Sequence, residues 1–193
     1  METVKIKHRE YQIVETVSDN SFIAERKDNK YFVRKFVPKS DEGNGLTYAL
    51  EKISRSGVKS PKLIAIDYKN GYAVSEYVEG QLMSEYLSSN DMTESMYEDL
   101  FKNAYFAKFD HMTLDYEPDK WMLVDNKLCY IYPYFIIYSK EKDLAEKYIR
   151  LWFNTKELAN FLTKLGIFYD KSRLKDDFHT NKNIVLMTCK YYR

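Results

Sequence analysis

The chain has 193 residues, enough for one domain with a sizeable core or for two small lobes. Its 30 Lys and Arg residues nearly balance 29 Asp and Glu residues, so bulk charge gives no reason to expect a nucleic-acid partner. No apolar run approaches the ~20 residues that cross a bilayer, and residues 1–7 lack an apolar signal segment. We therefore expect a cytoplasmic protein without a membrane partner.

Residues 1–37 predict antiparallel strands. Apolar and polar side chains alternate through this stretch, and polar turns at 18–21 and 28–30 interrupt the alternation. Three strands are therefore expected before Pro38.

Lys35 stands near the end of the third predicted strand. It alternates with Val33 and Val37, so we expect its side chain on the same face as these two apolar residues. A lysine facing inward needs a partner, whereas a lysine at a strand edge can reach solvent. The pattern alone leaves both roles open.

A helix is expected from the loop at 40–45 to about Ser56. Apolar side chains recur there at helical spacing, and Gly57 follows as a stop signal. Glu51 is the only acidic residue inside this predicted helix, and we interpret it as a surface side chain. Lys69-Asn70-Gly71 then predicts a hairpin turn between two strands.

The second half of the chain predicts mostly helices. Four are expected, at 82–87, 94–108, 140–153 and 154–166. Residues 89–94 form a capped entry to the second, and apolar side chains at helical spacing mark the second and third. The apolar run 183–189 fits either a strand or a helix.

The stretch 113–135 interrupts these helices. It comprises a loop at 114–120, an apolar strand at 121–124, an Asp-Asn-Lys turn at 125–127 and a second strand at 128–132. Two short apolar runs separated by an Asp-Asn turn are typical of a hairpin.

Together these features resemble the protein-kinase-like superfamily, in its small, divergent members: Rio-type kinases, lipopolysaccharide kinases and aminoglycoside phosphotransferases. The order of elements agrees over about residues 10–165, and Glu-Tyr-Val-Glu-Gly at 76–80 is similar to the hinge between kinase lobes. The resemblance implies an α+β, two-lobed protein-kinase-like fold. It has an antiparallel-sheet N-lobe at 1–78 and a minimal, mostly helical C-lobe at 79–193, which together form one kinase-like domain.

The resemblance also implies candidate site residues. Backbone groups of Glu76, Tyr77 and Val78 would contact an adenine, and Lys35 would contact the nucleotide phosphates, so ATP is the candidate cofactor. Asp115 precedes the hairpin, where the family has its catalytic Asp. Asp115 would be the base or the group that orients the attacking hydroxyl.

Two metal ligands of the family pattern are replaced in this sequence. Lys120 occupies the place of the loop Asn, and Tyr132 occupies the place of the metal-binding Asp. Mg²⁺ prefers oxygen ligands, which lysine lacks, and tyrosine is a poor magnesium ligand at neutral pH. No metal site is therefore assigned, and Lys120 is instead a candidate for direct contact with phosphate. The turn 18–21 also lacks the glycines of the family's phosphate-covering loop.

These replacements predict a pseudokinase that binds a nucleotide or a protein partner. The first alternative is an active, divergent ATP-dependent phosphotransferase that acts on serine/threonine or on a small molecule. In that alternative Asp115 acts on the substrate hydroxyl, and Asp110 or Asp119 holds Mg²⁺. The second alternative is an interaction module outside the kinase-like superfamily, with exposed tyrosines and apolar C-terminal residues as its contact surface. The pairing of Glu51 with Lys35, the substrate and the oligomeric state are left open.

Overall fold

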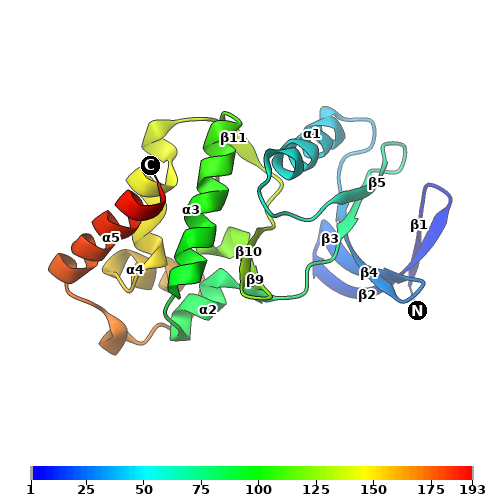
Figure 1. Ribbon diagram of the computed structural model, residues 1–193. Coiled ribbons are helices and arrows are strands. Elements are labelled where there is room, and N and C mark those ends of the chain that lie inside the picture. The colour runs from blue at the N-terminus through cyan, green and yellow to red at the C-terminus, as the bar shows by residue number, and fades with distance from the viewer. Residues whose placement is uncertain (1, 193) are drawn as a thin grey trace. The chain divides into compact units, whose positions relative to one another are not determined.

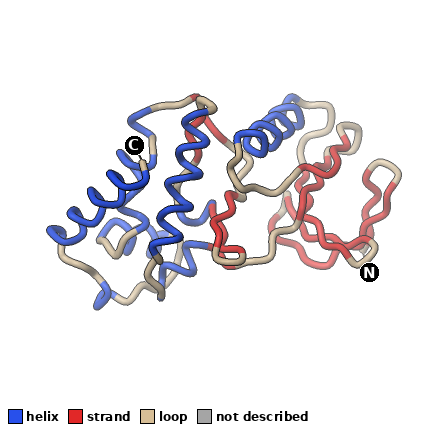
Figure 2. Tube along the Cα trace, in the orientation of Figure 1, coloured by secondary structure: helices blue, strands red, loops and turns tan. Residues whose placement is uncertain are grey.

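The structure is a computed structural model that describes residues 2–192. The predicted α+β class is confirmed: a large antiparallel sheet forms from the first part of the chain, and helices dominate the rest (Figures 1 and 2). The chain divides into two compact units. Unit 1 comprises Met1–Arg55 and Ser60–Glu79, and unit 2 comprises Ser56–Lys59 and Gly80–Arg193.

Unit 1 is built on a six-stranded antiparallel sheet in the order β1-β2-β3-β4-β6-β5. Its strands are β1 (Thr3–Ile6), β2 (Arg9–Ser18), β3 (Ser21–Arg26), β4 (Asn29–Lys35), β5 (Leu63–Asp67) and β6 (Tyr72–Glu76). The prediction of three strands before residue 38 was wrong by one. Lys7 takes a positive φ of 54°, which makes a tight turn and splits the first predicted strand into β1 and β2.

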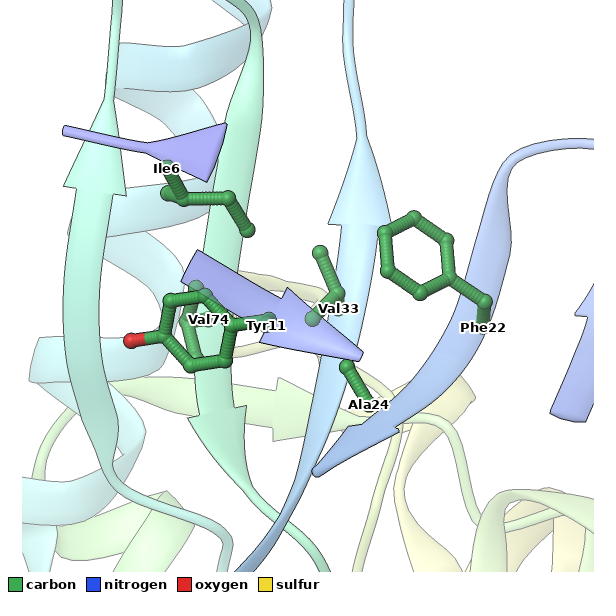
Figure 3. Close-up of a cluster of buried hydrophobic side chains, with 6 residues drawn as sticks. All are labelled: Ile6, Tyr11, Phe22, Ala24, Val33 and Val74. Atoms are coloured by element: carbon green, nitrogen blue, oxygen red, sulfur yellow. The ribbon is translucent and has the colours of Figure 1, made fainter. Parts of the chain in front are cut away.

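The sheet is curled, and a cluster of buried apolar side chains lies on one of its faces. The backbone N–H of Lys7, after β1, donates to Oδ2 of Asp67, at the end of β5, at 2.6 Å, which joins the two edge strands. Burial of apolar side chains stabilises this arrangement. The buried cluster on this face, called the Ile6 cluster below, comprises Ile6, Tyr11, Phe22, Ala24, Val33 and Val74 (Figure 3).

Helix α1 (Asp41–Ser56) lies between β4 and β5 in the chain and begins earlier than the sequence predicted. The segment expected to be a loop, 40–45, is mostly helical. Gly43 is buried in the first turns of α1 against the ring of Phe36. A Cβ at this position would lie 2.6 Å from Cε2 of Phe36, so only glycine allows the ring to pack so closely. The other buried residues of α1 are Ala49, Leu50 and Ile53.

The predicted hairpin at 69–71 is confirmed between β5 and β6. Asp67 closes the turn by accepting hydrogen bonds from the backbone N–H and the side-chain amide of Asn70, at 3.1 and 2.9 Å. Gly71 has a φ of 71°, and a Cβ there would lie 2.2 Å from the carbonyl oxygen of Phe36. Glycine is therefore required at this position.

Unit 2 combines helices with two small antiparallel sheets, ordered β10-β9-β7 and β11-β8. Its strands are β7 (Gln81–Leu82), β8 (Met112–Leu114), β9 (Trp121–Val124), β10 (Lys127–Tyr130) and β11 (Phe135–Ile137). The predicted hairpin is confirmed as β9–β10. Asp125 and Asn126 both take positive φ, 50° and 59°, in its two-residue turn.

The α-helices of unit 2 are α2 (Met83–Ser89), α3 (Glu94–Phe109), α4 (Lys156–Lys164) and α5 (Asp177–Tyr191). Thr93 and Thr155 cap α3 and α4 through their side chains, close to where the sequence predicted these two helices to begin. The apolar run 183–189, left open between strand and helix, is helical within α5. In the part of the chain that is described, no helix is both long and apolar enough to cross a membrane.

The regular helix predicted at 140–153 is absent. The segment instead contains 3₁₀ turns at Lys140–Lys142 and Ile149–Trp152 and a π-helical turn at Leu144–Tyr148. The interruption is at Asp143, which is extended and buried, and whose side chain accepts a hydrogen bond from the N–H of Leu144. A residue in the extended conformation cannot continue a helix.

Candidate functional site

Asp115 lies in the loop between β8 and β9, and buried side chains hold the backbone of this loop. Nε1 of Trp121 donates to the carbonyl oxygen of Asp115 at 3.0 Å. Nε1 of Trp152 donates to the carbonyl oxygen of Tyr116 at 2.9 Å. The N–H of Asp115 donates to the hydroxyl of Tyr130 at 3.2 Å. The loop backbone is therefore fixed by groups from three other segments.

These anchoring side chains form an aromatic core beneath the loop. The rings of Trp121 and Tyr130 lie 4.9 Å apart, and those of Trp121 and Trp152 lie 6.2 Å apart, edge to face. Burial raises the pKa of Tyr130, so it remains a neutral hydroxyl that can both accept and donate. Sequence reasoning assigned none of these residues to the site. Their only signal was the concentration of aromatic residues after Asp115.

The carboxylate of Asp115 is only partly engaged. Its Oδ1 accepts the N–H of Glu117 at 3.1 Å, while its Oδ2 has no hydrogen-bond donor among residues 2–192. Burial and the charges of Asp115 and Asp119 raise the pKa of Glu117. The loop therefore carries the carboxyl groups of Asp115, Glu117 and Asp119. The carboxylate of Asp115 is oriented by the backbone N–H of Glu117, two residues later in the same loop.

Lys120 is bound to its neighbour and rests on an aromatic ring. Its Nζ donates to Oδ2 of Asp119 at 2.5 Å and lies 5.3 Å from the ring centroid of Tyr132. Partial burial works to lower the pKa of Lys120, but the hydrogen bond to Asp119 and the surrounding carboxylates outweigh it and raise the pKa. Lys120 therefore carries a permanent positive charge at neutral pH.

The two residues in the predicted places of metal ligands thus contact each other. A cation–π contact joins Lys120 and Tyr132. Asp119 is paired with Lys120, although its Oδ1 is buried without a hydrogen-bond donor among the described residues. Asp110 stands at the C-cap of α3. Within residues 2–192, no group of three or more His, Cys, Asp or Glu side chains is arranged to hold a metal ion.

Lys35 ends β4 in unit 1 and is exposed. Its N–H donates to the carbonyl oxygen of Asn20 at 2.7 Å, and its Nζ lies 5.6 Å from the ring centroid of Phe22. Phe22 belongs to the Ile6 cluster and pairs in register with Val33, so Lys35 and Val33 share a face. Val37 lies beyond the end of the strand and is exposed.

The other polar side chains discussed together with Lys35, those of Glu51 and of the turn 18–21, bind partners other than Lys35. Glu51 pairs with Arg55 at 3.4 Å, one helical turn away in α1, and no ion pair in the described part of the chain joins Glu51 to Lys35. In the turn between β2 and β3, the hydroxyls of Ser18 and Ser21 are hydrogen-bonded to each other at 2.7 Å. This turn is closed by its own side chains.

The segment after β6 carries the predicted adenine contacts. The N–H of Glu76 donates to the carbonyl oxygen of Lys62 at 3.0 Å, so this group is already engaged. The backbones of Tyr77 and Val78 make no hydrogen bond to other described residues. Gly80 follows, where a Cβ would lie 2.4 Å from the carbonyl oxygen of Leu123, so the chain needs a glycine to pass β9.

The site residues therefore form two sets. Unit 1 carries Lys35 and the backbones of Tyr77 and Val78, which make no hydrogen bond to other described residues. Unit 2 carries the Asp115 carboxylate and the Lys120–Tyr132 contact. No protein-family model matches the sequence, and no curated protein matches it.

Proposed function

We propose that the chain is a two-lobed, kinase-like protein that acts as a pseudokinase, binding a nucleotide or a protein partner with weak or absent phosphoryl transfer. The order of elements supports this proposal. Unit 1 runs from antiparallel strands through one helix to two further strands and the 76–80 segment. Unit 2 continues through two helices to the Asp115 loop and the β9–β10 hairpin, the order that the resemblance implies.

The contact between Lys120 and Tyr132 carries the proposal. Phosphoryl transfer of the kinase type uses metal ions to bridge and neutralise the phosphates. A hard cation takes oxygen ligands, but here the ammonium of Lys120 and the phenol ring of Tyr132 occupy the two positions, 5.3 Å from Nζ to ring centroid. The ammonium supplies a positive charge near the loop but cannot coordinate Mg²⁺.

A thermal-shift titration with ATP, with and without Mg²⁺, tests nucleotide binding. A ligand that binds only the folded chain adds to its free energy of unfolding, by about 2.7 kcal/mol when the ligand concentration is 100 times Kd. The melting temperature rises as a result. We expect a shift that does not depend on Mg²⁺. A shift that appears only with Mg²⁺ would contradict the pseudokinase assignment.

Restoring the two ligands should restore metal dependence. The double variant Lys120→Asn, Tyr132→Asp supplies oxygen ligands at both positions, so its ATP shift should become larger with Mg²⁺ than without it. Lys120→Asn with Tyr134→Asp is the matched control, because Tyr134 is exposed and its ring lies 5.8 Å from that of Tyr132. An equal response of both double variants would contradict the role of Tyr132.

The alternative of an active phosphotransferase is favoured by one observation, the firmly held Asp115 with a free Oδ2 among the described residues. A phosphoryl-transfer assay with ATP and Mg²⁺ separates it from the pseudokinase. If transfer occurs, Asp115→Asn should reduce it by about 100-fold or more, in the range of general-base catalysis. Unchanged transfer in that variant would eliminate Asp115 as the catalytic group.

The alternative of an interaction module is favoured by α5. Phe178, Val185 and Leu186 are 75%, 59% and 56% exposed and stand on one face of the helix. If ATP produces no shift and light scattering finds a larger species that Val185→Asp converts to a monomer, the interaction module becomes the better assignment.

A further inference from the structure

The chain contains two Asn-Gly pairs, and the fold places them in different surroundings. Asn44-Gly45 lies near the start of α1, where both residues are exposed. Asn70-Gly71 lies in the hairpin between β5 and β6, where Asn70 is exposed and Gly71 is buried. Asparagine is a labile residue, and a following glycine has no Cβ to hinder attack by its backbone nitrogen. Both pairs are therefore candidates for spontaneous deamidation.

Deamidation of the hairpin pair requires a free backbone nitrogen at Gly71. This nitrogen loses its proton and attacks Cγ of Asn70. The N–Cγ bond forms as the Cγ–Nδ2 bond breaks, and the side-chain amide takes up a proton and leaves as ammonia. Water then opens the succinimide ring at either of its two carbonyl groups, which leaves Asp or isoAsp at position 70. The reaction thus consumes one water and releases one ammonia.

Asp67 holds both reacting groups of this pair. Its carbonyl oxygen accepts the N–H of Gly71 at 2.8 Å. Its Oδ2 accepts the side-chain amide of Asn70 at 2.9 Å, and its Oδ1 accepts the backbone N–H of Asn70 at 3.1 Å. The carbonyl oxygen of Gly71 is also held, because it accepts the N–H of Phe36 at 2.9 Å. A hydrogen-bonded amide loses its proton only when the bond opens, as in amide hydrogen exchange, so the fold opposes the first step.

We propose that Asn70 is a latent deamidation site that Asp67 keeps closed in the folded protein, and that modification of Asn70 weakens the contact between the edge strands β1 and β5. The Oδ2 of Asp67 that accepts the amide of Asn70 also accepts the N–H of Lys7 at 2.6 Å. Deamidation replaces the amide donor by a second carboxylate, and the isoAsp product also adds one methylene to the backbone of the turn. Two carboxylates that meet repel each other, so the product opposes the closed arrangement.

Peptide mapping by mass spectrometry, with separation of the Asn, Asp and isoAsp peptides, tests the protection. The protein is incubated at mildly alkaline pH, and both pairs are followed in the same sample. In the wild type, Asn70 should react at least about tenfold more slowly in the folded protein than in denaturing urea, because opening must precede attack. Asp67→Ala should raise the rate at Asn70 in the folded protein about tenfold, as expected when one or two hydrogen bonds no longer oppose opening. The rate at Asn44 should not change, so it is the internal reference.

Two outcomes of this experiment would overturn the proposal. One is an equal rate at Asn70 in the wild type and Asp67→Ala, and the other is an equal rise at Asn44 and Asn70, which would indicate general unfolding. If Asp67→Ala does not fold, the wild type still decides, because equal rates at Asn70 in the folded and the urea-denatured protein would show that the hairpin gives no protection.

The effect on the sheet has its own test. Asn70→Asp carries the charge of the product, so its melting temperature should be lower than that of the wild type. Asn44→Asp is the matched control, because a carboxylate near the N-terminus of α1 is favourable and should not lower the melting temperature. Equal melting temperatures of Asn70→Asp and the wild type would contradict the weakened contact between β1 and β5.

Discussion

Asp143 is 3% exposed, and three donors share its carboxylate. Oδ1 accepts the N–H of Leu144 at 2.8 Å, and Oδ2 accepts the hydroxyls of Tyr138 at 3.0 Å and Tyr192 at 2.5 Å. Its charge also contributes to raising the pKa of Tyr116, next to Asp115, after the larger effect of burial. One residue thus joins the segment after β11 to the end of α5.

Removal of this acceptor should be costly. Asp143→Ala leaves donors of Tyr138, Leu144 and Tyr192 without their partner, so we expect a loss of about 2–3 kcal/mol in the free energy of unfolding. Urea denaturation measures the change. Glu141→Gln, an exposed position two residues away, should stay within about 0.5 kcal/mol of the wild type. Equal stability of Asp143→Ala and Glu141→Gln would show that the three donors find other acceptors.

Among the elements, α1 contains two glycines in opposite surroundings. Gly43 is buried against the ring of Phe36, whereas a Cβ at Gly45 would meet no atom within 4 Å. Glycine in a helix costs about 0.5–1 kcal/mol relative to alanine, because it loses more backbone freedom on folding. Both glycines suggested a loop in the sequence, yet only Gly43 is needed for packing.

The two alanine substitutions should therefore have opposite effects. Gly45→Ala should stabilise the protein by about 0.5–1 kcal/mol, because it improves helix propensity without a clash. Gly43→Ala should destabilise it, because the added Cβ would lie 2.6 Å from Phe36 Cε2 and the ring must move. Melting temperatures of the two single variants provide the comparison. Stabilisation by both substitutions would mean that the Phe36 ring relaxes freely.

At the scale of the whole molecule, Asp91 ties distant segments of unit 2 together. Its carboxylate accepts hydrogen bonds from Asn154 at 2.6 Å, Arg173 at 2.7 Å and Lys175 at 3.1 Å. Asn154 in turn accepts the hydroxyl of Tyr169 at 3.0 Å. The hydrogen bond from Asn154, followed by those from Arg173 and Lys175, outweighs burial and lowers the pKa of Asp91 to about 2.

This lowered pKa predicts a dependence of stability on pH. The folded-state pKa of Asp91 lies below its ordinary value of 3.8, so the stabilisation is fully present above about pH 4 and is lost as the pH falls towards 2. Asp91→Asn should cost about 1 kcal/mol at pH 7, a modest figure because the side chain is half exposed and solvent screens its charge. The difference in the free energy of unfolding between Asp91→Asn and the wild type should become smaller between pH 4 and pH 2. Urea denaturation at each pH measures it.

A matched control isolates Asp91 from the general effect of acid. Asp19 lies in the exposed β2–β3 turn, and no ion pair within residues 2–192 involves it. Asp19→Asn should follow the wild type at every pH. A gap between Asp91→Asn and wild type that stays constant down to pH 2 would contradict the predicted role of the charge.

The amino-acid sequence by itself determined the features that depend on neighbours along the chain. The Asp125-Asn126 turn, the starts of α3 and α4 and the alternation in the first strands were all predictable, because turn dihedrals, helix-start signals and strand periodicity are local properties. The α+β class follows from the same local patterns.

The tertiary structure alone decided which residues meet across the fold. Asp143 interrupts a predicted helix and accepts the hydroxyl of Tyr192 from 49 residues away, and Trp152 reaches the Asp115 loop from 36 residues away. The surroundings of Arg34 and Lys35 also needed the position of the Ile6 cluster, since alternation places the two residues on opposite faces without saying which face the cluster covers. Periodicity specifies a pair of faces, and only the packing of other elements gives each face its environment.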